Sequence, residues 1–93
     1  MIIGVCTWQL LIPGAHSLKE KRMVVRSLKD RIGGKFNVSV AETAFQDIWQ
    51  RAEITVALVG TDTAFVDSVL TKVDLLIEAE GRAMITDTHR ELW

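Results

Sequence analysis

Hydrophobic positions repeat with two different periods along the chain, and the first period is that of β-strands. Apolar side chains alternate with other residues over 36–40 and 52–59, and more loosely over residues 1–12, which are rich in residues that favour strands. A two-residue period is typical of strands that bury one face. In all three segments the even-numbered positions are therefore predicted to face the core, and the odd-numbered positions to form an open face.

The second period, of three to four residues, predicts a first helix after Pro13-Gly14, which stops the first strand. Ser17 and Glu20 stand in the S-x-x-E order of a capping box, which marks a helix start. Apolar residues recur at helical spacing as far as Gly33-Gly34, a pair that favours helix termination. The pattern thus predicts a first helix that ends near residue 32.

A second helix is predicted after the third strand. Asp62 or Thr63 supplies its N-cap, an apolar stripe runs from Phe65 to Ile77, and Gly81 ends it. A more polar strand is expected over residues 82–90, and residues 43–50 have no clear period and predict a loop or a helical turn.

The predicted order of elements is β-α-β-β-α-β. Short connections and right-handed crossovers turn this order into a four-stranded antiparallel sheet with two helices on one face, the ferredoxin-like sandwich of the α+β class. A chain of 93 residues has the size of one domain, so residues 1–93 are predicted to form a single unit.

Composition excludes several classes of protein. The chain is 48% hydrophobic and 25% charged, which is ordinary for a globular domain, and no apolar run approaches the roughly 20 residues of a membrane helix. The single cysteine excludes an internal disulfide, and the first residues lack the basic segment of a signal peptide. We therefore expect a cytoplasmic protein without a membrane partner.

Charge is segregated along the chain, although the net charge is only −1. Seven of the eleven basic residues lie in the stretch 19–35, opposed there only by Glu20 and Asp30: Lys19, Lys21, Arg22, Arg26, Lys29, Arg31 and Lys35. Four of them, Lys19, Arg22, Arg26 and Lys29, fall within an arc of about 80° on a helix and are called the basic ridge below.

A linear ridge of cations suits a row of phosphates, so the candidate binding residues are the ridge together with Lys21. The expected partners are RNA or a ribosomal surface. Two other interpretations stay open, because the ridge is also typical of a solvated helix face. It can also pair, within the chain or between chains, with an acidic stripe on the second helix formed by Asp67, Asp74 and Glu78.

Lys21 stands in the middle of the apolar arc of its helix. A buried ammonium needs a counter-charge or a route to solvent. One prediction is that Lys21 pairs with Glu42, which lies on the core-facing side of the second strand, or that it extends past the helix end. The alternative is a lysine directed at a ligand near the helix start.

Two long motifs resemble a known family. S-L-K-E-K-R at 17–22 and K-F-N-V-S-V-A-E at 35–42, together with L-I-P-G at 11–14 and W-Q-R-A at 49–52, resemble the YlxP-like family of small bacterial proteins of unknown function. The resemblance implies a ferredoxin-like fold and genes that neighbour transcription and translation factors. It carries no catalytic residues.

An enzyme is not expected, although a phosphate-handling enzyme at the loop 13–17 is a less favoured alternative. This loop lacks the glycine-flanked pattern and the arginine of the acylphosphatases that share the fold. Cys6, His16 and His89 are scattered, so neither a nucleophile–base pair nor a metal site is predicted, and no cofactor is expected. His16, Trp49 and Arg51 are secondary binding candidates.

The open face of the predicted sheet suits a protein partner better than nucleic acid. Its odd-numbered positions in the first three strands include no aromatic residue on which a base could stack. Small and β-branched side chains favour packing against another subunit. A homodimer or higher oligomer, acting as an interaction scaffold, is therefore the alternative to RNA binding, with Ile3, Val5, Ala57 and Val59 as its contact face.

Overall fold

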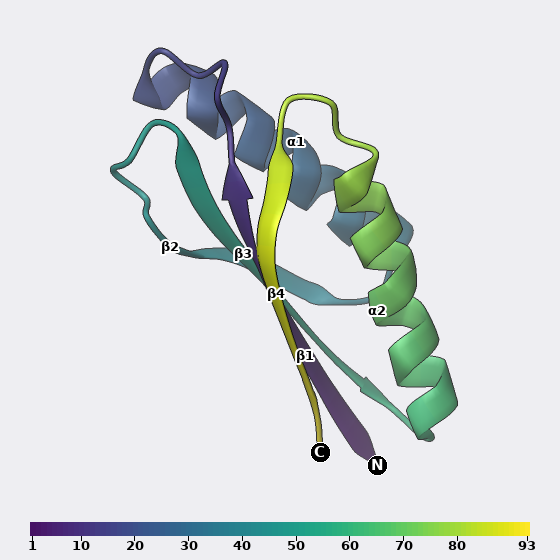
Figure 1. Ribbon diagram of the computed structural model, residues 1–93. Helices are drawn as coiled ribbons and strands as arrows, with labels where there is room; N and C mark the ends of the chain where they lie inside the picture. The colour runs from purple at the N-terminus through teal and green to yellow at the C-terminus, as the bar shows by residue number, and fades with distance from the viewer.

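The chain folds into an antiparallel sheet with both helices on one face (Figure 1). The computed structural model describes residues 1–93. Its elements, in chain order, are β1 (Ile2–Leu11), α1 (Leu18–Lys35), β2 (Ser39–Ala44), β3 (Arg51–Gly60), α2 (Thr63–Glu78) and β4 (Met84–Leu92). The strands are ordered β2-β3-β1-β4 and all neighbours are antiparallel, which confirms the predicted ferredoxin-like sandwich.

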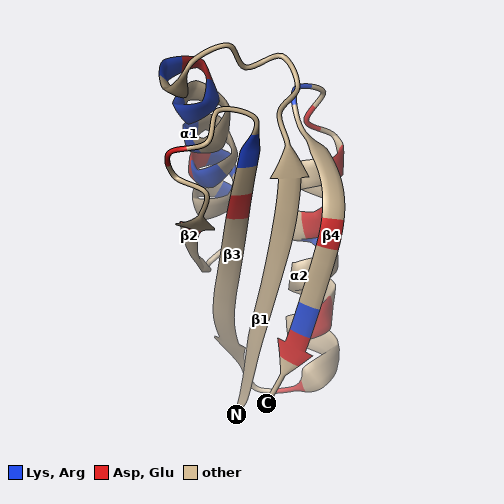
Figure 2. Ribbon diagram, turned by 60° about the vertical axis from the view of Figure 1, so that its left-hand side comes forward, with Lys and Arg blue, Asp and Glu red and all other residues tan.

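The alternation of side chains along the strands places the core as predicted. Trp8 lies opposite Ile54, Cys6 lies opposite Val56, and all four side chains are fully buried beneath the helices. Directly opposed residues in an antiparallel pair share a face, so the even-numbered positions of β1 and β3 form one continuous apolar floor. The odd-numbered positions belong to the opposite face of the sheet, because successive side chains of a strand point to opposite faces. Figure 2 shows that both helices lie on one side of the sheet and leave the other face uncovered.

The second helix packs close to the sheet because Gly4 has no side chain. A Cβ atom at Gly4 would lie 2.4 Å from the Cγ1 atom of Val66 on α2. Asp62 caps this helix by accepting a 2.8 Å hydrogen bond from the Phe65 amide, which settles the choice between Asp62 and Thr63. On the same helix, the Asp74 carboxylate accepts a 2.8 Å hydrogen bond from the Trp8 indole.

Two predicted boundaries are wrong around the end of α1. The helix continues through Gly33 and Gly34 to Lys35, and neither glycine adopts a positive φ. Phe36 is the C-cap instead, and its amide donates to the Ile32 carbonyl at 3.0 Å. Phe36 and Val38 therefore precede β2 rather than lie in it; they pack against the core from the connection, and the strand itself spans Ser39–Ala44.

The last strand extends beyond its predicted end and brings an aromatic residue onto the open face. A register shift opposite Gln9 and Leu10 marks a bulge, and β4 runs to Leu92 rather than to residue 90. Trp93 continues the ladder, because its amide and carbonyl exchange two 2.8 Å hydrogen bonds with Ile3. Trp93 thus shares the open face with Ile3, which the alternation in the first three strands alone did not reveal.

Candidate functional site

The basic ridge is a row of free cations on α1. Lys19, Arg22 and Arg26 are exposed and Lys29 is half-buried. None of the four takes part in any of the five ion pairs of the chain, and none donates a side-chain hydrogen bond. Lys19, Arg22 and Arg26, together with Met23, line a shallow hollow of about 270 Å³. The ridge therefore keeps its full charge available for a partner.

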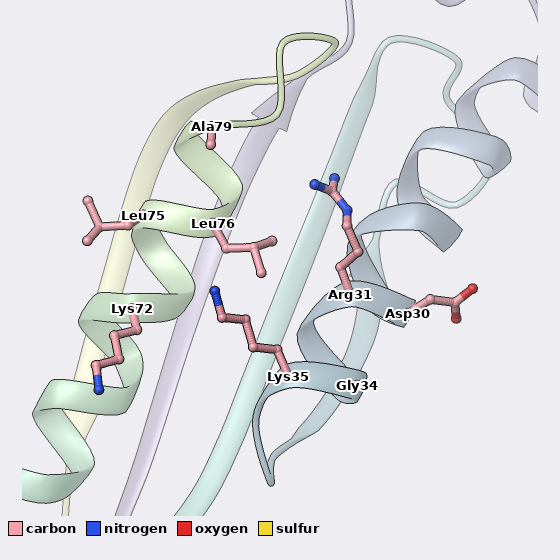
Figure 3. Close-up of a pocket in the computed structure, with 8 residues that line it drawn as sticks. All are labelled: Asp30, Arg31, Gly34, Lys35, Lys72, Leu75, Leu76 and Ala79. Atoms are coloured by element: carbon pink, nitrogen blue, oxygen red, sulfur yellow. The ribbon is translucent and has the colours of Figure 1, made fainter.

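The orientation of α1 explains why the ridge is unpaired. Arg31 and Lys35 mark the side of α1 that faces α2, where both line the groove between the helices (Figure 3). At 100° per residue, Arg22 lies about 180° around the helix from Arg31. The ridge thus points away from α2, and Figure 2 shows Lys and Arg gathered along α1.

Two of the three residues of the acidic stripe on α2 have other partners. Asp67 accepts a 2.6 Å hydrogen bond from the Arg90 guanidinium on β4, and Asp74 accepts a hydrogen bond from the Trp8 indole. Glu78 forms no ion pair. Pairing between ridge and stripe within one chain, one of the interpretations left open by the sequence, is therefore absent from this fold.

Lys21 does not belong to the exposed site with which the sequence grouped it. Its side chain is 1% exposed, and its Nζ atom lies 2.9 Å from Oε2 of Glu42 on β2. The same ammonium donates to the carbonyl of Phe45, immediately after β2. The predicted Lys21–Glu42 pair is confirmed, and the ammonium joins α1 to the β2–β3 connection instead of reaching a ligand.

The start of α1 is closed by its own side chains. Glu20 donates its amide to Ser17 Oγ at 3.1 Å, and the Glu20 carboxylate accepts from the His16 amide at 2.6 Å. This is the predicted capping box with one difference: the Glu20 carboxylate accepts from the amide of His16 and not from that of the N-cap residue Ser17. Because a carboxylate already occupies the positive end of the helix, a free phosphate would meet like charge there.

The loop before α1 is tied to the β2–β3 connection. The Gln50 side-chain amide donates to the carbonyls of Pro13 and Ala15 at 3.3 and 3.2 Å, and the Gln50 carbonyl accepts from the Ile12 amide at 2.9 Å. Phe45, in the same connection, adopts a φ of 63°. Both segments are therefore held in one arrangement beside the first turn of α1.

The three secondary candidates separate in space. His16 lies beside the ridge, because it shares a hollow with Met23. Trp49 is 51% exposed in the β2–β3 connection. Arg51 lies on the open sheet face, where its guanidinium carbon stands 4.1 Å from the centre of the Phe45 ring. The structure thus brings only His16 into contact with the surroundings of the ridge.

The largest hollow is the groove between the two helices, with a volume of about 690 Å³. Leu76 and Ala79 contribute apolar wall, and Lys35 extends from α1 toward α2 (Figure 3). Arg31 lines the groove too, but its guanidinium contacts Glu80 at 2.5 Å. The groove is therefore less basic than its composition suggests.

The open sheet face divides into a polar half and an apolar half. Hydroxyl groups in the polar half are linked across three strands, with Thr55 Oγ1 at 3.0 Å from that of Thr7 and 2.8 Å from that of Thr43. In the apolar half, Val59, Ile3 and Trp93 form one row and are 62%, 36% and 61% exposed.

The remaining chemical groups do not assemble into a reactive site. Cys6 is fully buried, and burial raises the pKa of its thiol against the opposing effect of Arg90. A neutral thiol is a weak nucleophile. No group of three or more His, Cys, Asp or Glu side chains is placed to hold a metal ion, and neither helix is long and apolar enough to cross a bilayer.

Sequence reasoning missed Glu80, which is 8% exposed and lies between α2 and β4. Its carboxylate accepts from Arg82 Nε at 2.8 Å and Nη2 at 2.9 Å, and it contacts Arg31 of α1 at 2.5 Å. Hydrogen bonds from Arg82 lower the pKa of Glu80 to about 2, in spite of burial, which raises it. In the sequence, only the Glu-Gly-Arg order at 80–82 indicates that Glu80 pairs with a nearby arginine.

Comparison with known proteins places the chain in a family. Residues 3–90 match the family described as protein of unknown function (DUF503), so the chain belongs to this family and the predicted YlxP-like membership is confirmed. It is 36% identical over 90 residues to the uncharacterized protein YlxP of Bacillus subtilis (strain 168), with 97% of this chain and 98% of the relative covered.

Among solved structures, the fold is similar to the designed protein LFR1 1, which has a ferredoxin fold and was determined by NMR. The TM-score is 0.51 at 14% sequence identity, over 99% of this chain and 84% of the designed one. At this level of identity the likeness concerns the fold alone, and function has to be argued from the sites.

Proposed function

We propose that the protein is a non-catalytic RNA-binding module, acting on RNA that is free or on the ribosome surface, through the basic ridge. The observation that carries this proposal is that four neighbouring cations on α1 have no acidic partner and face away from α2. Other basic side chains are paired locally, since Arg31 and Arg82 contact Glu80 and Arg90 contacts Asp67. A protein that binds phosphates needs cations that remain unneutralised until the partner arrives.

Binding by four ridge contacts predicts a measurable salt dependence. Each phosphate contact contributes about −0.7 to the slope of log K against log salt for single strands, so the ridge predicts a slope near −3. Arg22→Glu/Arg26→Glu should weaken RNA binding more than tenfold, while the melting temperature stays close to that of the original chain. Fluorescence anisotropy with labelled RNA at several salt concentrations measures both quantities.

A matched control separates the ridge from total charge. Lys35→Glu/Lys72→Glu changes the net charge by the same amount in the groove between the helices. This variant should retain most of the affinity. Equal losses of RNA affinity in the two double variants would show that binding depends on net charge and not on the ridge. Undetectable RNA binding at low salt would contradict the proposal.

Self-association through the open sheet face is a second candidate function, favoured by the position of Trp93. The row Val59–Ile3–Trp93 leaves three apolar side chains exposed side by side on a face that no helix covers. Four strands of up to ten residues present about 600 Å² per protomer, or about 1,200 Å² in a symmetric pair, the lower limit for a stable interface. A second copy of the chain fits this face, because a two-fold pair buries the row against itself.

The expected result is a dimer in sedimentation experiments at micromolar concentration. Val59→Lys should weaken the dimer at least tenfold and leave the fold intact, because this side chain is 62% exposed. Leu75→Lys, at a position 58% exposed on α2, is the control and should leave association unchanged. A monomer at high micromolar concentration would contradict self-association.

A further inference from the structure

Two hollows meet at Met23 on α1. The smaller one lies among the ridge cations, and the larger, of about 540 Å³, lies between the β1–α1 loop, the first turns of α1 and the Gly81–Arg82 turn. Met23 lines both hollows and is 60% exposed. A ligand that places phosphates on the ridge therefore has a second compartment directly beside them.

The larger hollow has a different chemistry from the ridge. Pro13 and Met23 are the exposed apolar residues of its lining, and its free acceptor capacity lies on the Glu20 carboxylate at the helix start. Arg82 also lines it, but its guanidinium is held by both oxygens of Glu80 at 2.8 and 2.9 Å. This combination disfavours an anion and suits a flat, uncharged group with N–H donors at its edge.

A nucleobase is such a group. Its faces are apolar enough to pack on proline and methionine, and its exocyclic amino group can donate to a carboxylate, as cytosine does to acidic side chains. We propose that the larger hollow receives one unpaired base of an RNA whose phosphates lie on the basic ridge. This inference rests on the proposed RNA-binding function and narrows it to single-stranded or looped RNA, because bases in an A-form helix are not free to enter a pocket.

The hollow is already formed without a ligand. Gln50 holds the carbonyls of Pro13 and Ala15, and Ala15 is 2% exposed. His16 is fixed through its amide to Glu20. Since the wall is ordered in advance, little binding energy is lost in ordering it, and one base contact can produce a measurable preference.

The experiment compares a labelled single-stranded RNA of twelve nucleotides with a duplex that offers the same number of phosphates per strand. The original chain should bind the single strand at least tenfold more tightly at the same salt concentration. Met23→Ser should weaken single-strand binding about tenfold and leave duplex binding unchanged. Gly14→Val adds a side chain to a residue that lines the hollow, at a position with free space around the added Cβ, and should give the same selective loss.

Leu75→Ser is the matched control, because Leu75 is 58% exposed on α2 and lies outside both hollows. It should change neither affinity, and melting curves should show that all variants are folded. Equal affinity for both RNAs, with Met23→Ser indifferent, would overturn this inference and leave the ridge function standing. Failure of both RNAs to bind at low salt would overturn the function and this inference together.

Discussion

Replacing Lys21 with alanine is expected to lower the free energy of unfolding by about 3–5 kcal/mol, which is the usual cost of removing one partner of a buried ion pair. The ammonium is 1% exposed and contacts Glu42 at 2.9 Å as well as the Phe45 carbonyl. Without it, the Glu42 carboxylate, whose side chain is 14% exposed, remains unpaired beneath α1. For a domain of this size the melting temperature should fall by at least about 12 °C, since 1 kcal/mol corresponds to about 4–8 °C.

Two further variants test the cause of this loss. Lys19→Ala removes an exposed lysine two residues away and should cost less than about 1 kcal/mol. Lys21→Met/Glu42→Leu removes both charges, keeps apolar volume and should recover most of the stability, because no unpaired carboxylate remains. Equal melting temperatures for Lys21→Ala and Lys19→Ala would show that the buried pair does not hold α1 to β2.

The faces of the strands were predictable because side-chain alternation is a local property of extended backbone. Trp8 and Ile54 are forty-six positions apart in the sequence, but each stands at an even position of its own strand and both are buried. The Lys21–Glu42 pair followed from the same logic, since each residue carries a charge on a face that its neighbours assign to the core. Such inferences need only the spacing of apolar side chains within a single strand or helix.

The end of α1 and the start of β2 were not predictable in this way. Gly33-Gly34 permits termination but does not require it, and the helix continues through both residues in right-handed geometry. The alternation that predicted a strand at Phe36 and Val38 reflects burial of these side chains from a connection, without ladder hydrogen bonds. Tertiary packing decides both boundaries, and a local pattern cannot report it.

The candidate site also has a part that local sequence predicts and parts that depend on tertiary packing. The basic ridge was predictable because helix geometry alone places its four residues on one side of the helix. The basic ridge is separated from the acidic stripe because of how α1 is rotated about its axis relative to α2. This rotation depends on the packing of both helices and cannot be predicted from the sequence of either helix alone. The hollow at Met23 was missed for the same reason, because its walls come from α1 and two loops that are far apart in the sequence.

The pH dependence of stability should contain a specific contribution from Glu80. Arg82 holds the pKa of this carboxyl at about 2 in the folded chain, against 4.5 for a free group. A carboxyl with a lowered folded-state pKa stabilises the fold fully above pH 4.5, and the contribution is lost as the pH falls from 4.5 toward 2. The full shift corresponds to about 3 kcal/mol, and screening of the half-exposed guanidiniums reduces the expected contribution to about 2 kcal/mol.

Urea unfolding of Glu80→Gln beside the original chain measures this contribution directly. At pH 7 the variant should be less stable by about 2 kcal/mol, because it keeps the shape of the side chain and loses the charge that binds Arg82 and Arg31. The two stabilities should converge as the pH falls toward 2, where the original carboxyl takes up a proton. Glu78→Gln, at an exposed position without an ion pair, should follow the original chain at every pH. A Glu80→Gln difference that stays constant from pH 7 to pH 2 would show that the lost stability comes from packing and not from the charge that joins α1 to the turn before β4.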